Sequence, residues 1–307
     1  MKRQNRKADG GTSQKQEKAS GPKGGPELQA VAHRSKANAA AAGDIRIGIS
    51  GWRYKGWRSV FYPKGLQHRR ELEYAADAFR SVEINGTFYS LQRPENFAAW
   101  AASTPKDFVF AVKGPRSITH MKRLKDAETP LANFFASGIF RLGHKLGPIL
   151  WQLPPNFRFD ADKLEHFFTL LPGDSQKAAA VARRHDKWLT KRADVRTRVK
   201  LKLRHALEIR HESFRVPEFI HLLREYDVAL VCADTVEWPR LMNLTSDFVY
   251  CRLHGSEVLY ASGYGKKYIE AWAQRRRVGH RQRTGRRRAH DCRSCAEACS
   301  TRRVSLF

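Results

Sequence analysis

Seven short apolar runs, each followed by a segment of helical periodicity, constrain the fold of this chain more than any other feature. Regular alternation of strands and amphipathic helices is typical of a parallel α/β sheet. The pattern therefore predicts an α/β fold. The predicted strands are Ile45–Ser50, Ser81–Thr87, Phe108–Gly114, Pro148–Leu153, His205–His211, Ala229–Asp234 and Phe248–Gly255.

Polar residues recur on one face of several of these strands. Side chains two residues apart in a strand point to the same side of the sheet. A charge buried in a sheet is costly unless it is paired or has a function. The pattern therefore predicts a polar pocket where the strands converge. The residues that share a face are Glu83 with Asn85, Glu208 with Arg210, and Arg252 with His254.

The length of the chain fits one barrel with extensions. A (β/α)8 barrel takes about 250 residues, and this chain has 307 residues with a formal net charge of +27. Residues 1–43 are basic and lack a hydrophobic period, which predicts a disordered arm. The N-terminus lacks the apolar segment typical of a secretory signal. The chain also contains no run of about 20 apolar residues, the length that a membrane-spanning helix needs. We therefore expect a cytoplasmic protein without membrane contact.

Segments with an apolar stripe separate the strands, and we assign them to the outside of a barrel. The predicted helices are His68–Phe79, Pro94–Ser103, Leu131–Leu142, Leu164–Leu171 and Val216–Tyr226. Two further basic runs cover residues 183–204 and 275–307. Each is interpreted either as a solvated surface or as a contact for nucleic acid or another anionic partner.

Long motifs occur in order through the chain. They include Gly51-Trp52-Arg53-Tyr54, Glu83-Ile84-Asn85-Gly86-Thr87-Phe88-Tyr89, Phe110-Ala111-Val112-Lys113-Gly114, Trp151-Gln152-Leu153-Pro154-Pro155, Leu207-Glu208-Ile209-Arg210-His211 and Cys251-Arg252-Leu253-His254-Gly255. With these motifs, residues 45–273 resemble the YecE-like family, also called domain of unknown function 72. The resemblance implies a TIM-type (β/α)8 barrel, and we assign that domain to residues 44–274. It implies no activity.

The C-terminal end departs from the family pattern after Trp272. We interpret residues 275–307 as an Arg/Cys-rich tail that is out of frame or disordered, so that the eighth strand is missing or replaced. Codons for Arg303–Phe307 read one base out of frame are compatible with an Asp-Val-Tyr-type strand. A missing strand would leave two sheet edges unpaired. Cysteines at 292, 295 and 299 with His290 resemble metal-ligand spacing, but a frameshift explains them more simply.

The candidate site lies at the carboxyl ends of the strands, where TIM barrels carry their active sites. The candidate catalytic residues are Glu83, Lys113, Glu208, His211, Asp234 and His254. The candidate substrate-binding residues are Ser50, Trp52, Asn85, Tyr89, His120, Gln152, Arg210, Arg252 and Tyr264. A network of buried ion pairs without catalysis is the alternative interpretation.

Three functional hypotheses fit these residues. The first is a hydrolase or lyase acting on a small anionic or phosphorylated ligand, with Arg210 and Arg252 as the anion clamp. Here Glu83 or Glu208 is the base and His254 or His211 the acid. A variant adds a divalent metal held by Glu208, His211, Asp234 and His254, although no metal signature supports it.

The second hypothesis is a Schiff-base lyase that uses Lys113, since a buried lysine with a lowered pKa attacks carbonyl groups. A charge partner for Glu83 is the alternative role of that lysine. The third is a nucleic-acid-binding barrel without catalysis. In it, Trp52, Tyr54 and Trp57 stack on bases and residues 183–204 contact phosphates. The same aromatic residues are also interpretable as packing at the barrel mouth.

Overall fold

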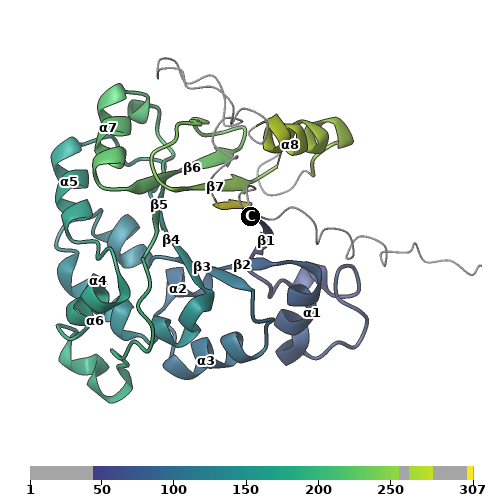
Figure 1. Ribbon diagram of the computed structural model, residues 1–307, viewed down its shortest axis with the longest axis horizontal. Coiled ribbons are helices and arrows are strands. Elements are labelled where there is room, and N and C mark those ends of the chain that lie inside the picture. The colour runs from purple at the N-terminus through teal and green to yellow at the C-terminus, as the bar shows by residue number, and fades with distance from the viewer. Residues whose placement is uncertain (1–43, 256–262, 279–302, 307) are drawn as a thin grey trace, which may run out of the picture. The chain divides into compact units, whose positions relative to one another are not determined.

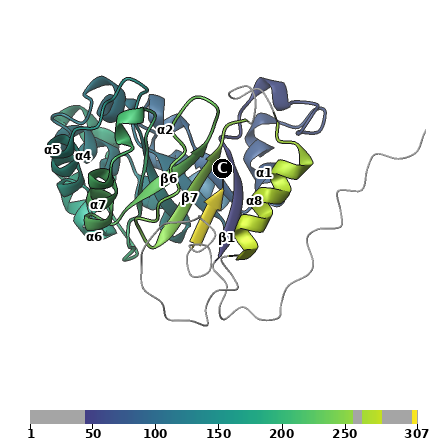
Figure 2. The ribbon, with the colours of Figure 1, turned by 90° about the horizontal axis from the view of Figure 1, so that it is seen from above.

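The computed structural model describes residues 44–255, 263–278 and 303–306 of the chain, and its strands form a parallel barrel (Figures 1 and 2). All seven predicted strands are present, and neighbours along the chain are neighbours in the sheet. The strands are β1 Ile45–Ser50, β2 Ser81–Ile84, β3 Val109–Lys113, β4 Leu146–Gln152, β5 His205–Glu208, β6 Val228–Asp234, β7 Phe248–Leu253 and β8 Arg303–Leu306.

The eighth strand decides between the two alternatives that the sequence leaves open, a missing strand or a replaced one. A missing strand would leave β1 and β7 with open edges, but Arg303–Leu306 pairs with both. Figure 2 shows this short strand, in yellow, between β7 and β1. The segment is four residues long and lies in an arginine-rich context, so its hydrophobic pattern is too short to predict a strand. The tail therefore supplies the replacement strand, and the barrel is closed.

Helices cover the outside of the barrel, mostly in the places the sequence predicts (Figure 1). Pro94 and Pro217 begin α3 and α7, where a missing backbone N–H costs nothing. The helices are α1 Glu71–Ala78, α2 Gly86–Tyr89, α3 Pro94–Ala102, α4 Glu128–Ala136, α5 Ala161–Thr169, α6 Ser175–Ala182, α7 Pro217–Glu225 and α8 Lys266–Val278. The predicted domain boundary at residue 274 falls within α8.

The alternation of strand and helix fails at one place. Residues 235–247 join β6 to β7 without forming a helix, although the sequence pattern predicts one after every strand. Pro239 in this short connection cannot donate a backbone hydrogen bond, and a proline disfavours helix at the residue before it. Among the described residues, no helix is long and apolar enough to cross a membrane.

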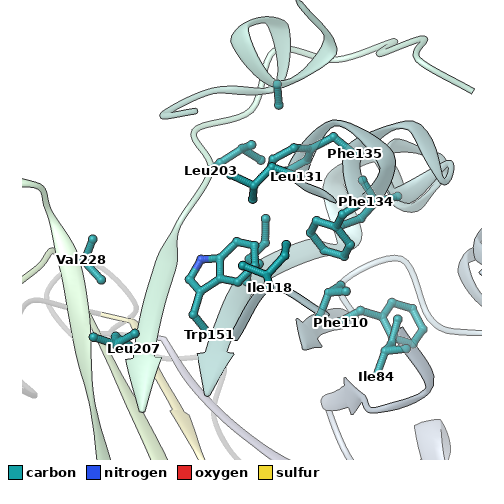
Figure 3. Close-up of a cluster of buried hydrophobic side chains, with 14 of the residues drawn as sticks. Ile84, Phe110, Ile118, Leu131, Phe134, Phe135, Trp151, Leu203, Leu207 and Val228 are labelled. Carbon is teal, nitrogen blue, oxygen red and sulfur yellow. The ribbon is translucent and has the colours of Figure 1, made fainter. Parts of the chain in front are cut away.

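The main hydrophobic core lies between the sheet and the helices, around Trp151 (Figure 3). The Trp151 ring is fully buried, with its centroid 5.9 Å from that of Phe134 and 5.3 Å from that of Phe167. Its Nε1 donates to His205 Nδ1 at 3.2 Å. Gly114 is needed beside it, because a Cβ there would lie 2.4 Å from the indole ring. This packing fixes the end of β3, directly after Lys113.

Inside the barrel, a small apolar cluster supports the polar residues above it. Its members are Ala111, Leu150, Ala206, Ala229, Val231, Phe248 and Tyr250. Three of these strands carry a polar residue two positions after a member of the cluster, namely after Ala111, Leu150 and Ala206. Side chains two residues apart point to the same side of a strand, so these polar side chains also face the barrel interior. Those residues are Lys113, Gln152 and Glu208. The fold therefore places a polar layer at the carboxyl ends of the strands.

Candidate functional site

Two buried carboxylates and one arginine form the centre of the polar layer. Arg252 on β7 donates from Nε and Nη2 to the two oxygens of Glu83 at 3.0 and 2.9 Å. Its Nη1 donates to Glu208 Oε2 at 2.5 Å. Both glutamates are fully buried, and Arg252 is 4 % exposed. Arg252 therefore neutralises two charges that would otherwise face each other across the barrel.

Further hydrogen bonds complete the surroundings of Glu83 on β2. Ser50 Oγ donates to Oε1 at 2.8 Å, and Tyr250 OH donates to Oε2 at 2.7 Å. Asn85 Nδ2 donates in turn to Ser50 Oγ at 2.9 Å. Burial alone would raise the pKa of Glu83, but Arg252, Lys113 and these hydrogen bonds outweigh it and hold the pKa below its usual value. Glu83 is therefore an anchored, ionised carboxylate.

Glu208 on β5 has a similar environment on the other side of the barrel. Gln152 Nε2 and Arg210 Nε both donate to its Oε1 at 2.9 Å. Burial opposes ionisation, but Arg252 and Arg210 outweigh it and lower the pKa of Glu208. The guanidinium of Arg210 also stacks on Trp238, 3.7 Å from the ring centroid. Neither carboxylate has the raised pKa that an acid catalyst requires at neutral pH.

Lys113 differs from the other cations of the layer. It is 9 % exposed, and in the part of the chain that the structure describes its ammonium has no hydrogen-bond acceptor and no carboxylate within 4 Å. Its Nζ lies 4.0 Å from the centroid of the Phe88 ring. Burial, reinforced by Arg252, lowers the pKa of Lys113 to about 8, against the opposing effect of Glu83 and Glu208. Lys113 and Glu83 still act on each other's pKa, so the alternative role of this lysine as a charge partner for Glu83 is met without a direct ion pair.

Two histidines border the layer. His254 Nε2 lies 3.3 Å from Arg252 Nη1 and, because that arginine can only donate, must accept there. Burial and then Arg252 lower the pKa of His254 to about 4. For His120, which packs edge-on against Phe88, burial and then Lys113 lower the pKa to about 4. Both imidazoles are therefore neutral at pH 7.

Several predicted site residues lie elsewhere. Asp234 faces α8, because Ala233 takes the inward position on β6; its carboxylate accepts from Arg240 and from Trp272 Nε1. His211 caps the turn Glu212–Phe214 through the backbone N–H of Ser213. Tyr264 OH bonds to the backbone of Asp234 and Gly255. These three residues support the loops around the mouth.

The predicted site residues Trp52 and Tyr89, both aromatic, lie in different environments. Trp52 is 7 % exposed and packs edge-on against Trp100, so it belongs to the core. Tyr89 is 68 % exposed, with its ring 5.1 Å from that of Phe88. Tyr250 and Trp238 also contact the charged residues, although neither is among the predicted site residues. Period-2 alternation with Arg252 could have found Tyr250, but Trp238 lies on a loop without any such signal.

The proposed metal ligands do not converge. Among the described residues, no group of three or more histidine, cysteine, aspartate or glutamate side chains is positioned to hold a metal ion. Asp234 and His211 lie outside the layer, and Glu208 is bonded to Arg252, Arg210 and Gln152. The site residues therefore do not fit the divalent metal of the hydrolase variant. His290 and the cysteines of the tail lie outside the described residues.

The fold and this layer define a class: a TIM-type barrel with a charged, buried cluster at the carboxyl ends of its strands. Residues 46–292 match the family described as Protein of unknown function DUF72, and the chain belongs to that family. The resemblance to YecE-like proteins is thereby confirmed.

Relatives and solved structures agree with this assignment. UPF0759 protein YecE of Escherichia coli is 30% identical over 154 residues, which cover 50% of this chain and 53% of YecE. UPF0759 protein YunF of Bacillus subtilis is 30% identical over 118 residues, or 37% of this chain and 41% of YunF. The chain thus spans about half the length of the curated relatives it matches.

Two solved structures share the fold. A DUF72 family protein from Thermotoga maritima superposes with a TM-score of 0.59 at 24% identity, over 86% of this chain and 92% of that one. A DUF72 family protein from Enterococcus faecalis superposes with a TM-score of 0.54 at 18% identity, over 86% and 90%. At these identities the superpositions support the architecture alone.

Proposed function

We propose that the polar layer is the substrate site of an enzyme that acts on a small anionic compound. The observation that carries this proposal is a surplus of positive charge in a buried place. Lys113, Arg210 and Arg252 stand against Glu83 and Glu208, the other charged groups of the layer in the described part of the chain. Glu83 and Glu208 are bonded to arginine, whereas Lys113 has no anionic partner within 4 Å there. An anion beside Lys113 balances the layer.

The geometry distributes the roles differently from the sequence prediction. Arg252 cannot clamp a substrate, because its three nitrogens donate to Glu83 and Glu208. Its role is to hold the layer together. Lys113 is the contact for the anion, and Arg210, stacked on Trp238, borders it. Neutral His120 and His254 are hydrogen-bonding groups at the edge of the site rather than acids.

Replacing Lys113 with methionine tests the anion site. A hydrogen bond to a charged group in such a site contributes about 1.5–3 kcal/mol, so the K113M variant should bind inorganic phosphate or lactate at least about tenfold more weakly. Isothermal titration calorimetry measures the affinity. K113R should keep most of the binding, because it keeps the charge.

Lys106→Met is the matched control, since Lys106 is exposed in the turn that precedes β3. It should bind like the unsubstituted protein. Equal affinity in the K113M and K106M variants, with circular dichroism showing both folded, would remove the anion site.

A nucleic-acid-binding function has separate support, away from the polar layer. Trp188 is 58 % exposed, with the Arg192 guanidinium 4.9 Å from its ring centroid. The surrounding segment, residues 183–200, precedes β5 and so lies toward the amino ends of the strands. Its exposed cations are Arg183, Arg184, Lys187, Lys191, Arg196, Arg198 and Lys200. Exposed aromatic and cationic groups together suit single-stranded nucleic acid.

Salt dependence distinguishes this alternative. If this surface contacts phosphates, affinity for a single-stranded oligonucleotide should fall steeply as the salt concentration rises. The double substitution Lys187→Gln and Lys191→Gln should then reduce the slope of log affinity against log salt concentration by about two. Fluorescence anisotropy measures both. A Lys64→Gln, Lys106→Gln pair is the control of equal charge. Identical slopes for the two pairs would reject this surface as the contact.

A further inference from the structure

We propose that the substrate of this site is a 2-oxo acid and that Lys113 forms a Schiff base with its keto carbon. The inference rests on the proposed anion site and names its substrate class and its nucleophile. It starts from the position of Lys113: a buried amine at the carboxyl end of a barrel strand, directly below the mouth and beside surplus positive charge.

The local contacts leave the amine available to react. Most buried lysines are held by a carboxylate, but both carboxylates of the layer are bonded to arginine. Lys113 instead rests against the face of Phe88, 4.0 Å from the ring centroid. The ring face attracts the ammonium, but burial and the neighbouring charge of Arg252 outweigh this attraction and make the proton easier to lose than in water. A useful fraction of the amine is therefore neutral near pH 8.

A compact substrate fits this arrangement. In a 2-oxo acid the carboxylate is bonded directly to the keto carbon, so an anion attracted by the positive charge around Lys113 brings its carbonyl group next to the amine. Arg210 borders Lys113 closely enough to affect its pKa. Lys113 is only 9 % exposed, so a small compound reaches its amine more readily than a large one. The positive charge around Lys113 and the low exposure of its amine therefore both favour a small 2-oxo acid.

The covalent step balances without a further reactant. The neutral amine of Lys113 adds to the keto carbon, and the C=O electron pair moves to oxygen. One proton passes from nitrogen to that oxygen, giving a carbinolamine. The C–O bond then breaks, and the oxygen leaves as water after taking up a second proton from solvent, giving the protonated imine. His120, which packs edge-on against the same Phe88 ring and is close enough for Lys113 to lower its pKa, has a neutral imidazole that can relay a proton.

Borohydride trapping with pyruvate tests the inference on the full chain. Reduction should attach pyruvate to Lys113, raising the mass of its peptide by that of pyruvic acid less one oxygen atom. Trapping should increase with pH up to about 8 and then level off, because the amine is mostly neutral above its pKa. An ordinary lysine would continue to gain up to its pKa of about 10.4. Burial sets this value first, followed by the charges of Arg252, Glu83, Glu208 and Arg210 around Lys113. His120 is a further titratable group near Lys113.

Two variants separate this inference from the anion site. K113R keeps the positive charge and should still bind lactate, which has no keto group, but should give no adduct. K106R removes an exposed lysine and should give the full adduct. An adduct at Lys113 that is absent from K113R supports the inference. Lactate binding without any pyruvate adduct, or adducts spread equally over exposed lysines, overturns it and leaves the anion site standing. Loss of lactate binding in K113M but not in K113R supports the anion site, on which the Schiff-base inference rests.

Discussion

Replacing Arg252 with methionine is expected to lower the free energy of unfolding by about 3–5 kcal/mol, because it leaves two fully buried carboxylates without their shared partner. Urea unfolding followed by circular dichroism measures the change. The loss should be smaller at pH 5 than at pH 8. Arg252 is the main group that lowers the pKa of Glu83 and Glu208. Without it their pKa values rise above the unfolded value, and protonation then stabilises the fold.

The matched control is Arg80→Met. Arg80 pairs with Asp107 at 2.8 Å, but both side chains are more than half exposed, so this change should alter stability by less than about 1 kcal/mol. If the R252M and R80M variants unfold at the same urea concentration, Arg252 does not hold the polar layer together. The interpretation of the layer as a charge-balanced site would then fail.

Replacing Trp151 with alanine is expected to cost about 3–5 kcal/mol, the usual loss for a large ring deleted from a packed core. The ring lies between β4 and the helices (Figure 3), and its removal also leaves His205 Nδ1 without its donor. Thermal and urea unfolding measure the effect. A loss below about 1 kcal/mol would mean that the helices repack against the sheet and fill the cavity left by the Trp151 ring.

Trp188→Ala is the control for this substitution. It removes the same side chain from an exposed position, so stability should change by no more than about 0.5 kcal/mol. Comparing the two variants separates the effect of burial from that of losing a tryptophan.

The polar layer is the common physical basis of the proposed anion site and of the proposed Schiff base at Lys113. Charges at the carboxyl ends of the strands are held by hydrogen bonds to each other, which fixes their positions before any ligand arrives. Arg252 supplies that order, and in both proposals Lys113 is the group that meets the ligand. We thus assign the positioning role to Arg252 on β7 and the reacting role to Lys113 on β3, two strands that are not neighbours in the sheet.

Local patterns in the sequence determined the strands and the directions of their side chains. Alternation in β2, β5 and β7 placed Glu83, Glu208 and Arg252 on one face, because side-chain direction in a strand depends only on position along it. The resemblance of the motifs to the family predicted that the sheet forms a barrel. The order of the sheet followed, since strands joined by short helical connections become neighbours.

Only the tertiary structure decided which of those residues meet. Pairing depends on distances across the barrel, so the sequence could not show that Arg252 engages both carboxylates while Lys113 engages neither. The same reason explains the outward position of Asp234, whose partners Arg240 and Trp272 come from a loop and a helix. It also explains β8: Arg303–Leu306 is a strand because β1 and β7 offer it two open edges, and no local preference of four residues encodes that.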